Sequence, residues 1–520
     1  MRKSILEYFM GKAEAFYAFF VWSRISNDKN SYHLYGVKKM KNENSKREFK
    51  HWPYLWLAVG FILLIFSNGI HRIIPLAAWL APILLLRFTR KNSLLLFLPV
   101  NIIAWVIMTY NLYGSIMPIW VGIITGIIYG LIFFISFAAD KKIKVKGFLK
   151  TLVFPLAVVS IEYLISLTPL NSWFSLAYTQ NNLVLMQLGS ITGYLGISFM
   201  IAWFASTVNW AWEHEFSFNK IKKGVAIYLS ISIIVLIFGG AYLTFLPTDS
   251  NTIKTASITR SFDMDVEAGK CNKDVPCLEK LFNKSLNEFL ESSKLAVDNG
   301  AQIIVWQENA LAVYKRDEVE FIAKVKEFAI DEKVYMIVGM YVLSEDRSSD
   351  ENQAILITPS GETEEYLKNY LTPGDNHITG DGKILVHDSE YGKLGLIICQ
   401  DAHYLNFVKQ AKEVDIMLIL NHNWESITPY YAEMSFFRAI EQGFNIVSAA
   451  YHGLSYAVDY HGDVLAEMND FTTEERIMIA DIPKQGIKTI YSQIGDFFAW
   501  LCILGLFTMI WLSFSKLKKE

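Results

Sequence analysis

The sequence predicts two kinds of structure in one chain, a polytopic α-helical membrane domain and an α/β domain outside the bilayer. The first observation is an uneven composition: 52% of the 520 residues are hydrophobic, and they gather in long apolar runs between residues 53 and 246 and near 495–515. An apolar run of about 18 residues or more can cross the hydrocarbon core as a helix. The second observation is that residues 250–490 have the mixed composition of a soluble domain. The third is that Lys and Arg gather on alternate sides of the apolar runs.

These changes in composition divide the chain into four segments. They are a basic cytoplasmic tail (1–50), a membrane domain with seven spans (51–248), an extracytoplasmic α/β domain (249–490), and a C-terminal transmembrane helix with a cytoplasmic tail (491–520). No cleavable signal peptide is evident, because Glu7, Lys12 and Glu14 interrupt the aromatic stretch near the N-terminus. We therefore expect the first span to act as an uncleaved insertion signal.

Eight apolar segments are expected to cross the membrane. They lie at roughly Pro53–Ile70, Ile74–Phe88, Ser93–Tyr110, Met117–Ala139, Leu149–Leu167, Leu183–Trp203, Val225–Leu246 and Phe497–Phe514.

Basic residues set the expected orientation, since loops rich in Lys and Arg stay in the cytoplasm. They are concentrated in the N-terminal tail, in the loops after the second, fourth and sixth spans, and at the C-terminus. The loops Asn111–Ser115 and Thr168–Asn182 contain neither Lys nor Arg, and only Arg72 runs against the pattern. The pattern predicts that both termini are cytoplasmic and that residues 249–490 lie outside. The net charge of -3 points to no nucleic-acid partner.

The four cysteines are scattered, and none has the spacing of a metal site. Cys271 and Cys277 are close in sequence and would form a disulfide if their domain lies outside the cytoplasm. Two unpaired loop cysteines are an equally good interpretation, so the sequence leaves this pair open.

The soluble segment alternates helix and strand patterns. Helical periodicity is expected over Leu278–Val297, Glu318–Ile330 and Ala402–Lys412, and apolar strands over Gln302–Trp306, Val334–Val342, Leu394–Ile398 and Ile416–Leu420. This alternation predicts an α/β domain whose helices cover a sheet.

Three residues of this segment are candidates for chemistry. Cys399 follows the strand Leu394–Ile398 directly and opens a helical segment, where α/β proteins place reactive groups and where a helix N-terminus lowers a thiol pKa. Glu308 follows the strand Gln302–Trp306 and is suited to accept a proton. Lys368 lies among apolar and aromatic residues and is suited to stabilise an oxyanion. Taken singly, each has a structural alternative: a buried cysteine, a helix cap and a surface lysine.

In this order the three residues resemble the Glu–Lys–Cys triad of the carbon–nitrogen hydrolase (nitrilase) superfamily. The resemblance includes Lys368 in an aromatic-Leu-Lys-x-x-Leu-x-Pro-Gly segment and spans roughly residues 253–485. It implies a nitrilase-like α-β-β-α sandwich. It also implies that Glu308 is the general base, Lys368 the oxyanion stabiliser and Cys399 the nucleophile.

A nitrilase-like domain between seven spans and an eighth resembles the apolipoprotein N-acyltransferase branch of that superfamily. The membrane segment Met186–Phe199 is similar to the Q-x-x-x-x-x-G-x-x-G-x-S-F signature of the branch. Asn421–Trp424 and Arg438–Gly443 are similar to two later segments, the second with the pattern R-A-x-E-x-G.

Four positions depart from the family pattern. They are Asp375 in place of a further Glu after the lysine, Gln400-Asp401 in place of Tyr-Glu after the cysteine, Gln307 in place of Pro before Glu308, and Tyr451-His452-Gly453 in place of N-x-G. We expect Asp375, Asp401, Asn423 and Trp424 to bind substrate or to support the triad.

The resemblance implies acyl transfer in two steps, without a metal or other cofactor. Cys399 would take an acyl chain from a phospholipid as a thioester, and the N-terminal amine of a diacylglyceryl-cysteine lipoprotein would then accept it. Both substrates lie in a membrane, expected to be the bacterial cytoplasmic (inner) membrane. Two aromatic residues near Trp424, namely Tyr430 and Tyr431, are suited to contact lipid, although packing is the commoner role of such residues.

Other interpretations remain open at this point. The same triad with water as the acceptor would make a membrane-anchored amidase, and a degenerate domain would make a non-catalytic membrane scaffold. A Cys–His protease would need a histidine beside Cys399, and His403 is the nearest in sequence. Glu162 lies inside the fifth span, where a carboxylate is either functional or a hydrogen-bonded structural group.

Overall fold

The computed structural model describes residues 52–67, 74–113, 116–372 and 375–517. The predicted basic tail (1–50), Arg72, the end of the Asn111–Ser115 loop, Pro373-Gly374 and the last three residues lie outside the described residues.

All eight predicted spans fall on helical segments. The helices are α3 (Trp52–Ser67), α4 (Pro75–Lys91), α5 (Leu94–Tyr113), α6 (Ile119–Lys142), η1 (Gly147–Leu152) running into α7 (Val153–Ser166), α8 (Leu183–Met186), α9 (Gly189–Thr192), α10 (Tyr194–Glu213), α11 (Phe218–Phe245) and α18 (Phe497–Leu517). Within the described ranges, five of these segments are long and apolar enough to cross a membrane, and a bent pair would make a sixth. The chain therefore has a helical membrane domain, and the full count of eight spans stays a prediction.

The sixth predicted span is bent rather than straight. Leu183–Thr192 and Tyr194–Glu213 meet at an angle of 117°, with Gly193 between them at φ +65°. A side chain at Gly193 would come within 2.7 Å of the Tyr491 ring, so both its backbone conformation and its surroundings favour glycine. The predicted span Leu183–Trp203 therefore falls on two helical segments with a sharp bend between them.

The soluble domain contains two sheets. One has seven strands, in the order β13 (Ile477–Pro483), β1 (Thr252–Ile258), β2 (Ile303–Trp306), β4 (Tyr335–Leu343), β5 (Glu351–Ile357) and β6 (Thr363–Leu367), with β3 (Leu311–Tyr314) pairing β4. The other has six strands, in the order β12 (Val464–Asn469), β11 (Leu454–Val458), β10 (Asn445–Tyr451), β9 (Ile416–His422), β8 (Gly392–Ile398) and β7 (Leu385–Ser389). The central strands β1, β2 and β4 are parallel, and so are β8, β9 and β10.

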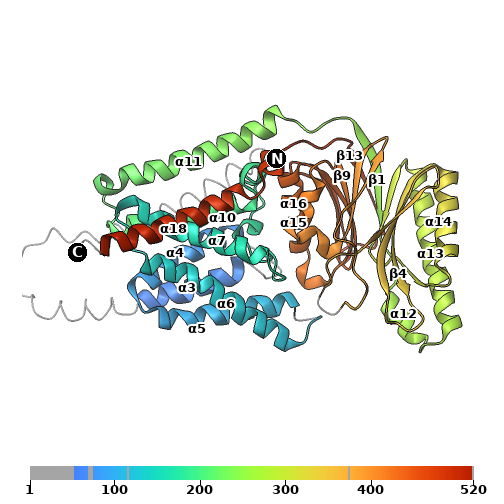
Figure 1. Ribbon diagram of the computed structural model, residues 1–520, viewed down its shortest axis with the longest axis horizontal. Helices are drawn as coiled ribbons and strands as arrows, with labels where there is room; N and C mark the ends of the chain where they lie inside the picture. Colours follow the sequence, from blue (N-terminus) through green and yellow to red (C-terminus); the bar gives the residue numbers. More distant parts are fainter. Residues whose placement is uncertain (1–51, 68–73, 114–115, 373–374, 518–520) are drawn as a thin grey trace, which may run out of the picture. The chain divides into compact units, whose positions relative to one another are not determined.

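Successive side chains of a strand point to opposite faces of its sheet. One face of each sheet packs against the other sheet, and the outer face is covered by helices. In β2, Ile303 and Val305 pack into the core shared with the second sheet, whereas Ile304 and Trp306 pack under α13 (Val275–Asp298) and α14 (Glu318–Glu332). Figure 1 shows α13 and α14 on the outer side of the sheet of β1 and β4, and α15 (Leu405–Val408) and α16 (Tyr430–Gln442) beside the sheet of β9. The predicted α-β-β-α sandwich is confirmed.

Most predicted elements of this domain match helices or strands. The exception follows Cys399, where one helix was expected over Ala402–Lys412. The chain instead forms three short pieces, η3 (Cys399–His403), α15 (Leu405–Val408) and η4 (Lys409–Ala411). The Asp401 carboxylate accepts bonds from the backbone N–H groups of Ile398, Asn369 and Tyr370. These bonds to another segment compete with a regular helix at its first turn.

Cys271 and Cys277 form a disulfide. They flank the turn between α12 (Met264–Lys270) and α13, so the bond closes this exposed corner of the domain. The alternative of two unpaired loop cysteines is not what the structure has.

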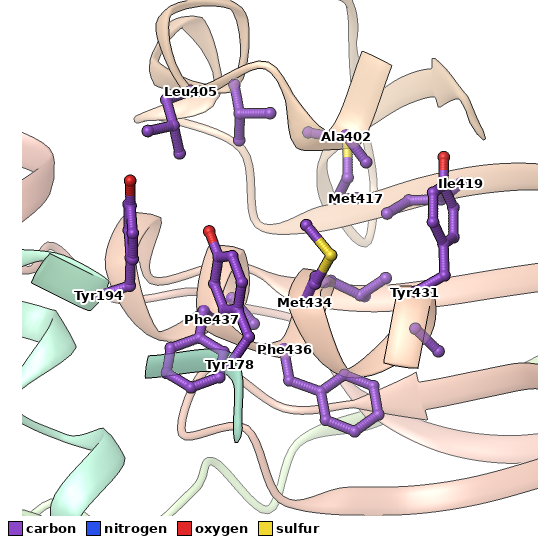
Figure 2. Close-up of a cluster of buried hydrophobic side chains, with 14 of the residues drawn as sticks. Tyr178, Tyr194, Ala402, Leu405, Met417, Ile419, Tyr431, Met434, Phe436 and Phe437 are labelled. Carbon is purple, nitrogen blue, oxygen red and sulfur yellow. The ribbon is translucent and has the colours of Figure 1, made fainter. Parts of the chain in front are cut away.

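Two of the motifs noted in the sequence meet in space. Glu441 of α16 accepts a hydrogen bond from the backbone N–H of Tyr194 at 2.7 Å, which is the first residue of α10 after the bend. The same carboxylate pairs with Arg438 at 2.7 Å, with 3% and 0% of the two side chains exposed. Arg438 also donates to the Tyr178 hydroxyl at 2.5 Å, and the rings of Tyr178 and Tyr194 stack at 5.0 Å. Figure 2 shows these two tyrosines beside Phe437 of α16.

Glu162 lies close to the same junction, inside α7. Its carboxylate accepts bonds from the hydroxyls of Ser175 and Ser198, both at 2.7 Å, and from the backbone N–H of Leu176 at 3.2 Å. Three donors satisfy the group, which agrees with the structural alternative. Glu162 thereby fixes the segment that carries Trp173 and Tyr178.

Replacing Glu441 by Gln is expected to weaken this junction strongly. The amide oxygen of the introduced glutamine can still cap Tyr194, but the buried Arg438 guanidinium loses its counter-charge, which costs about 3–5 kcal/mol. Thermal unfolding in detergent should show a clearly lowered midpoint. Glu433→Gln on the same helix is the matched control. Glu433 is half-buried, and among the described residues it forms no salt bridge, unlike Glu441. Equal midpoints for the two variants would refute the importance of the pair.

Candidate active site

Glu308 and Lys368 form a buried ion pair at the ends of two strands of the first sheet. The Lys368 Nζ lies 3.0 Å from the Glu308 Oε1, and each side chain is 3% exposed. Glu308 Oε1 also accepts from the Asn352 amide at 2.8 Å, and Oε2 accepts from the backbone N–H of His422 at 2.9 Å. These three bonds hold the Glu308 carboxylate in one orientation.

A glycine allows Glu308 to take this position. Gly339 of β4 lies under the turn after β2, and a Cβ there would be 2.1 Å from the Gln307 carbonyl oxygen and 3.0 Å from the Glu308 Cα. The Gln307 side chain, which departs from the family pattern, accepts a bond from the backbone N–H of Arg260 at 2.8 Å. Arg260 in turn donates to the carbonyl of Ala310 at 2.9 Å. The backbone on both sides of Glu308 is thus fixed.

Cys399 lies where β8 ends, at φ +48°, a backbone conformation that non-glycine residues rarely adopt. The residue is buried and its Sγ lies 3.4 Å from the Tyr431 hydroxyl. Burial, and next the charge of Glu308, raise the pKa of the thiol to about 12, although Lys368 acts in the opposite direction. The expectation that a helix N-terminus lowers this pKa is wrong, because only a short 3-10 turn follows and desolvation dominates.

Asp375 joins Glu308 in neutralising Lys368. Its Oδ2 lies 3.0 Å from the Lys368 Nζ and 3.4 Å from the Nε2 of His377. Burial acts to raise the pKa of Asp375, but His377, Lys368 and the backbone N–H of Thr372 outweigh it and hold the pKa well below its usual value. Burial likewise acts to lower the pKa of Lys368, and the charges of Glu308, Cys399 and Asp375 hold it above its usual value. Lys368 is therefore a fixed cation between two carboxylates.

Asp401 does not face the triad directly but ties its segments together. Its carboxylate accepts from the Tyr366 hydroxyl at 2.5 Å and from the backbone N–H of Tyr370 at 2.8 Å, on either side of Lys368. It also accepts from the backbone N–H of Ile398 at 3.3 Å, next to Cys399. Burial raises the pKa of Asp401 to about 6 in spite of these bonds. A supporting role of Asp401 in catalysis stays a prediction.

In the described part of the chain, the hydrogen bonds of Asn423 and Trp424 go to other residues than Glu308, Lys368 and Cys399. Asn423 donates its backbone N–H to the Tyr451 carbonyl at 2.9 Å. The Trp424 indole donates to the Leu112 carbonyl, at the end of α5, at 2.9 Å. Tyr430 and Tyr431 are buried, so the packing alternative holds for these two aromatic residues. A substrate contact by Asn423 or Trp424 stays a prediction.

His403 is not placed as a catalytic base. Its ring packs against the Tyr431 ring with centroids 4.0 Å apart, and burial lowers the pKa of the imidazole to about 3. The thiol lies within hydrogen-bonding distance of the Tyr431 hydroxyl rather than of the His403 ring. These contacts do not favour a Cys–His protease. Among the described residues, no group of three or more His, Cys, Asp or Glu side chains is placed to hold a metal ion.

Sequence reasoning missed Asn352 and the contact of Tyr431 with Cys399. Asn352 reaches Glu308 only because β5 pairs antiparallel with β4. Tyr431 lies 32 residues after Cys399 on a different element. Neither residue carries a local motif, so no signal in the sequence pointed to them.

Parts of the chain are similar to known proteins. Residues 280–491 match the carbon–nitrogen hydrolase family. A protein from Geobacter metallireducens named apolipoprotein N-acyltransferase is 25% identical over 89% of this chain and 95% of its own length. Apolipoprotein N-acyltransferase 1 from Treponema denticola is 24% identical over 73% of this chain and 79% of its own. The solved structure of an amidase from Nesterenkonia sp. is 16% identical over 48% of this chain and 95% of its own, with a TM-score of 0.35.

The matched residues contain all three members of the buried constellation, Glu308, Lys368 and Cys399. The similarity to the curated relatives extends beyond them into the membrane helices. Residues 280–491 therefore match the carbon–nitrogen hydrolase family, and the chain is similar beyond them to proteins named apolipoprotein N-acyltransferase.

Proposed function

We propose that this protein is an N-acyltransferase that moves an acyl chain from a phospholipid to the N-terminal amine of a diacylated lipoprotein. The observation that carries the proposal is the buried Glu308–Lys368 pair, whose charges both act on the Cys399 thiol, in a chain similar over nearly its whole length to an apolipoprotein N-acyltransferase. A nitrilase-like domain alone would not need the membrane helices to which this one is joined.

In the first step Cys399 takes the acyl chain. Glu308 accepts the thiol proton while Sγ attacks the ester carbonyl carbon. Lys368 stabilises the negative charge that develops on the carbonyl oxygen. The C–O bond to the glycerol then breaks, and Glu308 returns its proton to the alkoxide. The products are a thioester on Cys399 and a lysophospholipid.

In the second step the lipoprotein amine attacks the thioester. Glu308 takes a proton from the attacking nitrogen, and Lys368 again stabilises the oxyanion. The C–S bond breaks, its electron pair stays on sulfur, and the proton on Glu308 restores the thiol. The sequence of steps needs no metal or redox group. Water must be kept from the thioester, and the burial of Cys399 supports this.

The catalytic domain would work at the bilayer surface. Loops of the membrane helices contact the elements around Cys399: the Tyr430 hydroxyl donates to the Trp173 carbonyl, and the Trp173 ring packs 5.4 Å from the ring of Tyr431. In a second contact, Ser426 donates to the carbonyl of Leu112, at the end of α5, at 2.9 Å. These contacts support a site that both membrane-held substrates can reach.

We further propose eight spans, cytoplasmic termini and an extracytoplasmic catalytic domain. The distribution of Lys and Arg supports this orientation, and so does the Cys271–Cys277 disulfide, because disulfides persist outside the reducing cytosol. The exposed residues Lys280 and Lys142 lie on the predicted outer and inner sides. In right-side-out vesicles, a membrane-impermeant maleimide should label Lys280→Cys at once and Lys142→Cys only after permeabilisation. The reverse order would overturn the orientation.

The proposed function is tested with the purified protein in phospholipid vesicles and a fluorescent diacylated lipopeptide. The expected result is a lipopeptide carrying one more acyl chain, bound as an amide, with one lysophospholipid formed for each product. Release of free fatty acid without lipopeptide product would indicate a hydrolase instead. No turnover of the phospholipid, with the protein shown to be folded, would reject the phospholipid donor.

A further inference from the structure

The hydroxyl of Tyr431 lies within hydrogen-bonding distance of two groups that differ in whether they donate or accept. It is 3.4 Å from the Cys399 Sγ and 3.3 Å from the Gln400 Oε1. The amide oxygen of Gln400 only accepts hydrogen bonds, whereas sulfur can donate as a thiol or accept as a thiolate. A phenol has one proton, so it can donate to one of these two neighbours at a time.

The ring of Tyr431 is fixed so that the hydroxyl stays at this position. Tyr431 is 2% exposed and lies on α16. Its ring is held by His403, with centroids 4.0 Å apart, and by Trp173 at 5.4 Å. Figure 2 shows Tyr431 packed in the cluster that includes Ala402, Ile419 and Met434. Turning the O–H bond is therefore the motion open to the group, and it needs no movement of the ring.

We propose that Tyr431 is a further catalytic residue, whose hydroxyl accepts the Cys399 thiol proton in a hydrogen bond at rest and donates a hydrogen bond to the thiolate once Glu308 has removed that proton. In the resting state the Tyr431 hydroxyl donates its hydrogen bond to the Gln400 Oε1. When sulfur becomes charged, the O–H bond turns and donates to the thiolate instead. Tyr431 itself neither gains nor loses a proton, so each step described above keeps its balance. The same bond stabilises the sulfur that leaves when the amine opens the thioester.

The electrostatics of the site support a donor at this place. The charged groups that act on the thiol are Glu308, which opposes ionisation, and Lys368, which favours it. Burial is the largest effect and raises the pKa of Cys399, while the bond with Tyr431 and the backbone N–H of His422 lower it. Lys368 already serves two carboxylates. A neutral donor beside sulfur therefore stabilises the thiolate without adding charge to a crowded site.

The direct test is Tyr431→Phe, which keeps the ring and removes the hydroxyl. In the described residues the free cysteines are Cys399 and Cys502, so the measurements are made on the full chain with Cys502→Ala and without reductant. The rate of alkylation by iodoacetamide between pH 7 and 10 reports the thiolate fraction of Cys399. We expect this rate to fall by about 10- to 100-fold at each pH, the range for loss of a hydrogen bond to a charged group.

Tyr430→Phe is the matched control, because it makes the same change at the neighbouring residue. The Tyr430 hydroxyl bonds to the Trp173 carbonyl and not to sulfur, so the alkylation rates should equal those of the parent. If Tyr430→Phe and Tyr431→Phe slow alkylation equally, the effect comes from disturbed packing, and the inference is rejected.

Gln400→Met provides a test of opposite sign. Methionine removes the strong competing acceptor at similar volume, which leaves the phenolic proton free for sulfur. Alkylation should become faster by about 2- to 10-fold, the range for one neutral hydrogen bond. If both variants unfold at the same temperature as the parent, partial unfolding cannot explain why one variant is alkylated more slowly and the other faster. An unchanged or slower rate in Gln400→Met would overturn the inference even if Tyr431→Phe failed to fold.

The substrate reactions then extend the test, and this part rests on the proposed function. With labelled phospholipid, Tyr431→Phe should slow both thioester formation and its discharge by the lipopeptide. Alkylation needs neither substrate. Altered alkylation in the variants with no acyl transfer by the parent would therefore refute the proposed substrates and leave the role of Tyr431 standing.

Discussion

Replacing Cys399 by Ala is expected to abolish acyl transfer, with a loss of at least about 10⁴-fold in turnover. Cys399 is the residue on which the charges of Glu308 and Lys368 converge, and alanine offers no atom that can hold the acyl chain. The thermal midpoint should change little, because a small side chain is replaced by another. Turnover is measured in vesicles with the fluorescent lipopeptide.

Cys502→Ala is the control for this variant. Cys502 is the other free cysteine of the described residues and lies on the C-terminal helix α18. This helix carries none of the residues Glu308, Lys368 and Cys399. The Cys502→Ala variant should retain full turnover. Acyl transfer by Cys399→Ala at a rate near that of the parent would remove the thioester from the mechanism and favour direct transfer or a contaminating enzyme.

Replacing Lys368 by Met is expected to damage both activity and stability. The variant keeps the length of the side chain but removes the cation that Glu308 and Asp375 share. Removing one partner of a buried ion pair costs about 3–5 kcal/mol. Loss of an oxyanion donor lowers turnover by about 10²- to 10³-fold. Both quantities are measured on the purified protein, by thermal or denaturant unfolding and by single-turnover acylation.

Lys315→Met is the matched change on the surface. Lys315 also bridges two carboxylates, Glu318 and Glu351, but it is half-exposed. Exposed ion pairs contribute about 0–1 kcal/mol, so this variant should be nearly as stable as the parent and fully active. Similar behaviour of the two methionine variants would show that burial of the Lys368 pair is not what matters.

The sequence predicted the division of the chain and most elements from apolar runs and periodicity alone. The runs predicted the positions of the membrane helices, and the apolar run Gln302–Trp306 predicted the strand that the structure has as β2, buried along its whole length. The bend at Gly193 could not be predicted in this way, because the residues on both sides of it are equally apolar. Its causes are the left-handed backbone at Gly193 and the cap that Glu441 provides from a distant segment.

The candidates Glu308, Lys368 and Cys399 could be named from the sequence because Glu308 and Cys399 follow predicted strands and Lys368 lies in a segment similar to the family pattern. Their surroundings could not be predicted, since they depend on sheet register and on contacts between distant elements. Asn352 of β5 reaches Glu308 past the intervening strand β4, and Tyr431 reaches Cys399 from α16. The raised pKa of the thiol has the same origin: burial by several elements dominates over the local turn that the sequence suggested.

The measurement that tests the central claim most directly is the isolation of the acyl-enzyme. The purified protein is incubated with phospholipid that carries a labelled acyl chain, without an acceptor, and the label on the protein is then treated with hydroxylamine. We predict stoichiometric label that hydroxylamine releases, that a diacylated lipopeptide discharges as an amide, and that Cys399→Ala does not acquire. Label that persists in Cys399→Ala, or folded wild-type protein that acquires none while still acylating the lipopeptide, would contradict a mechanism through a thioester at Cys399.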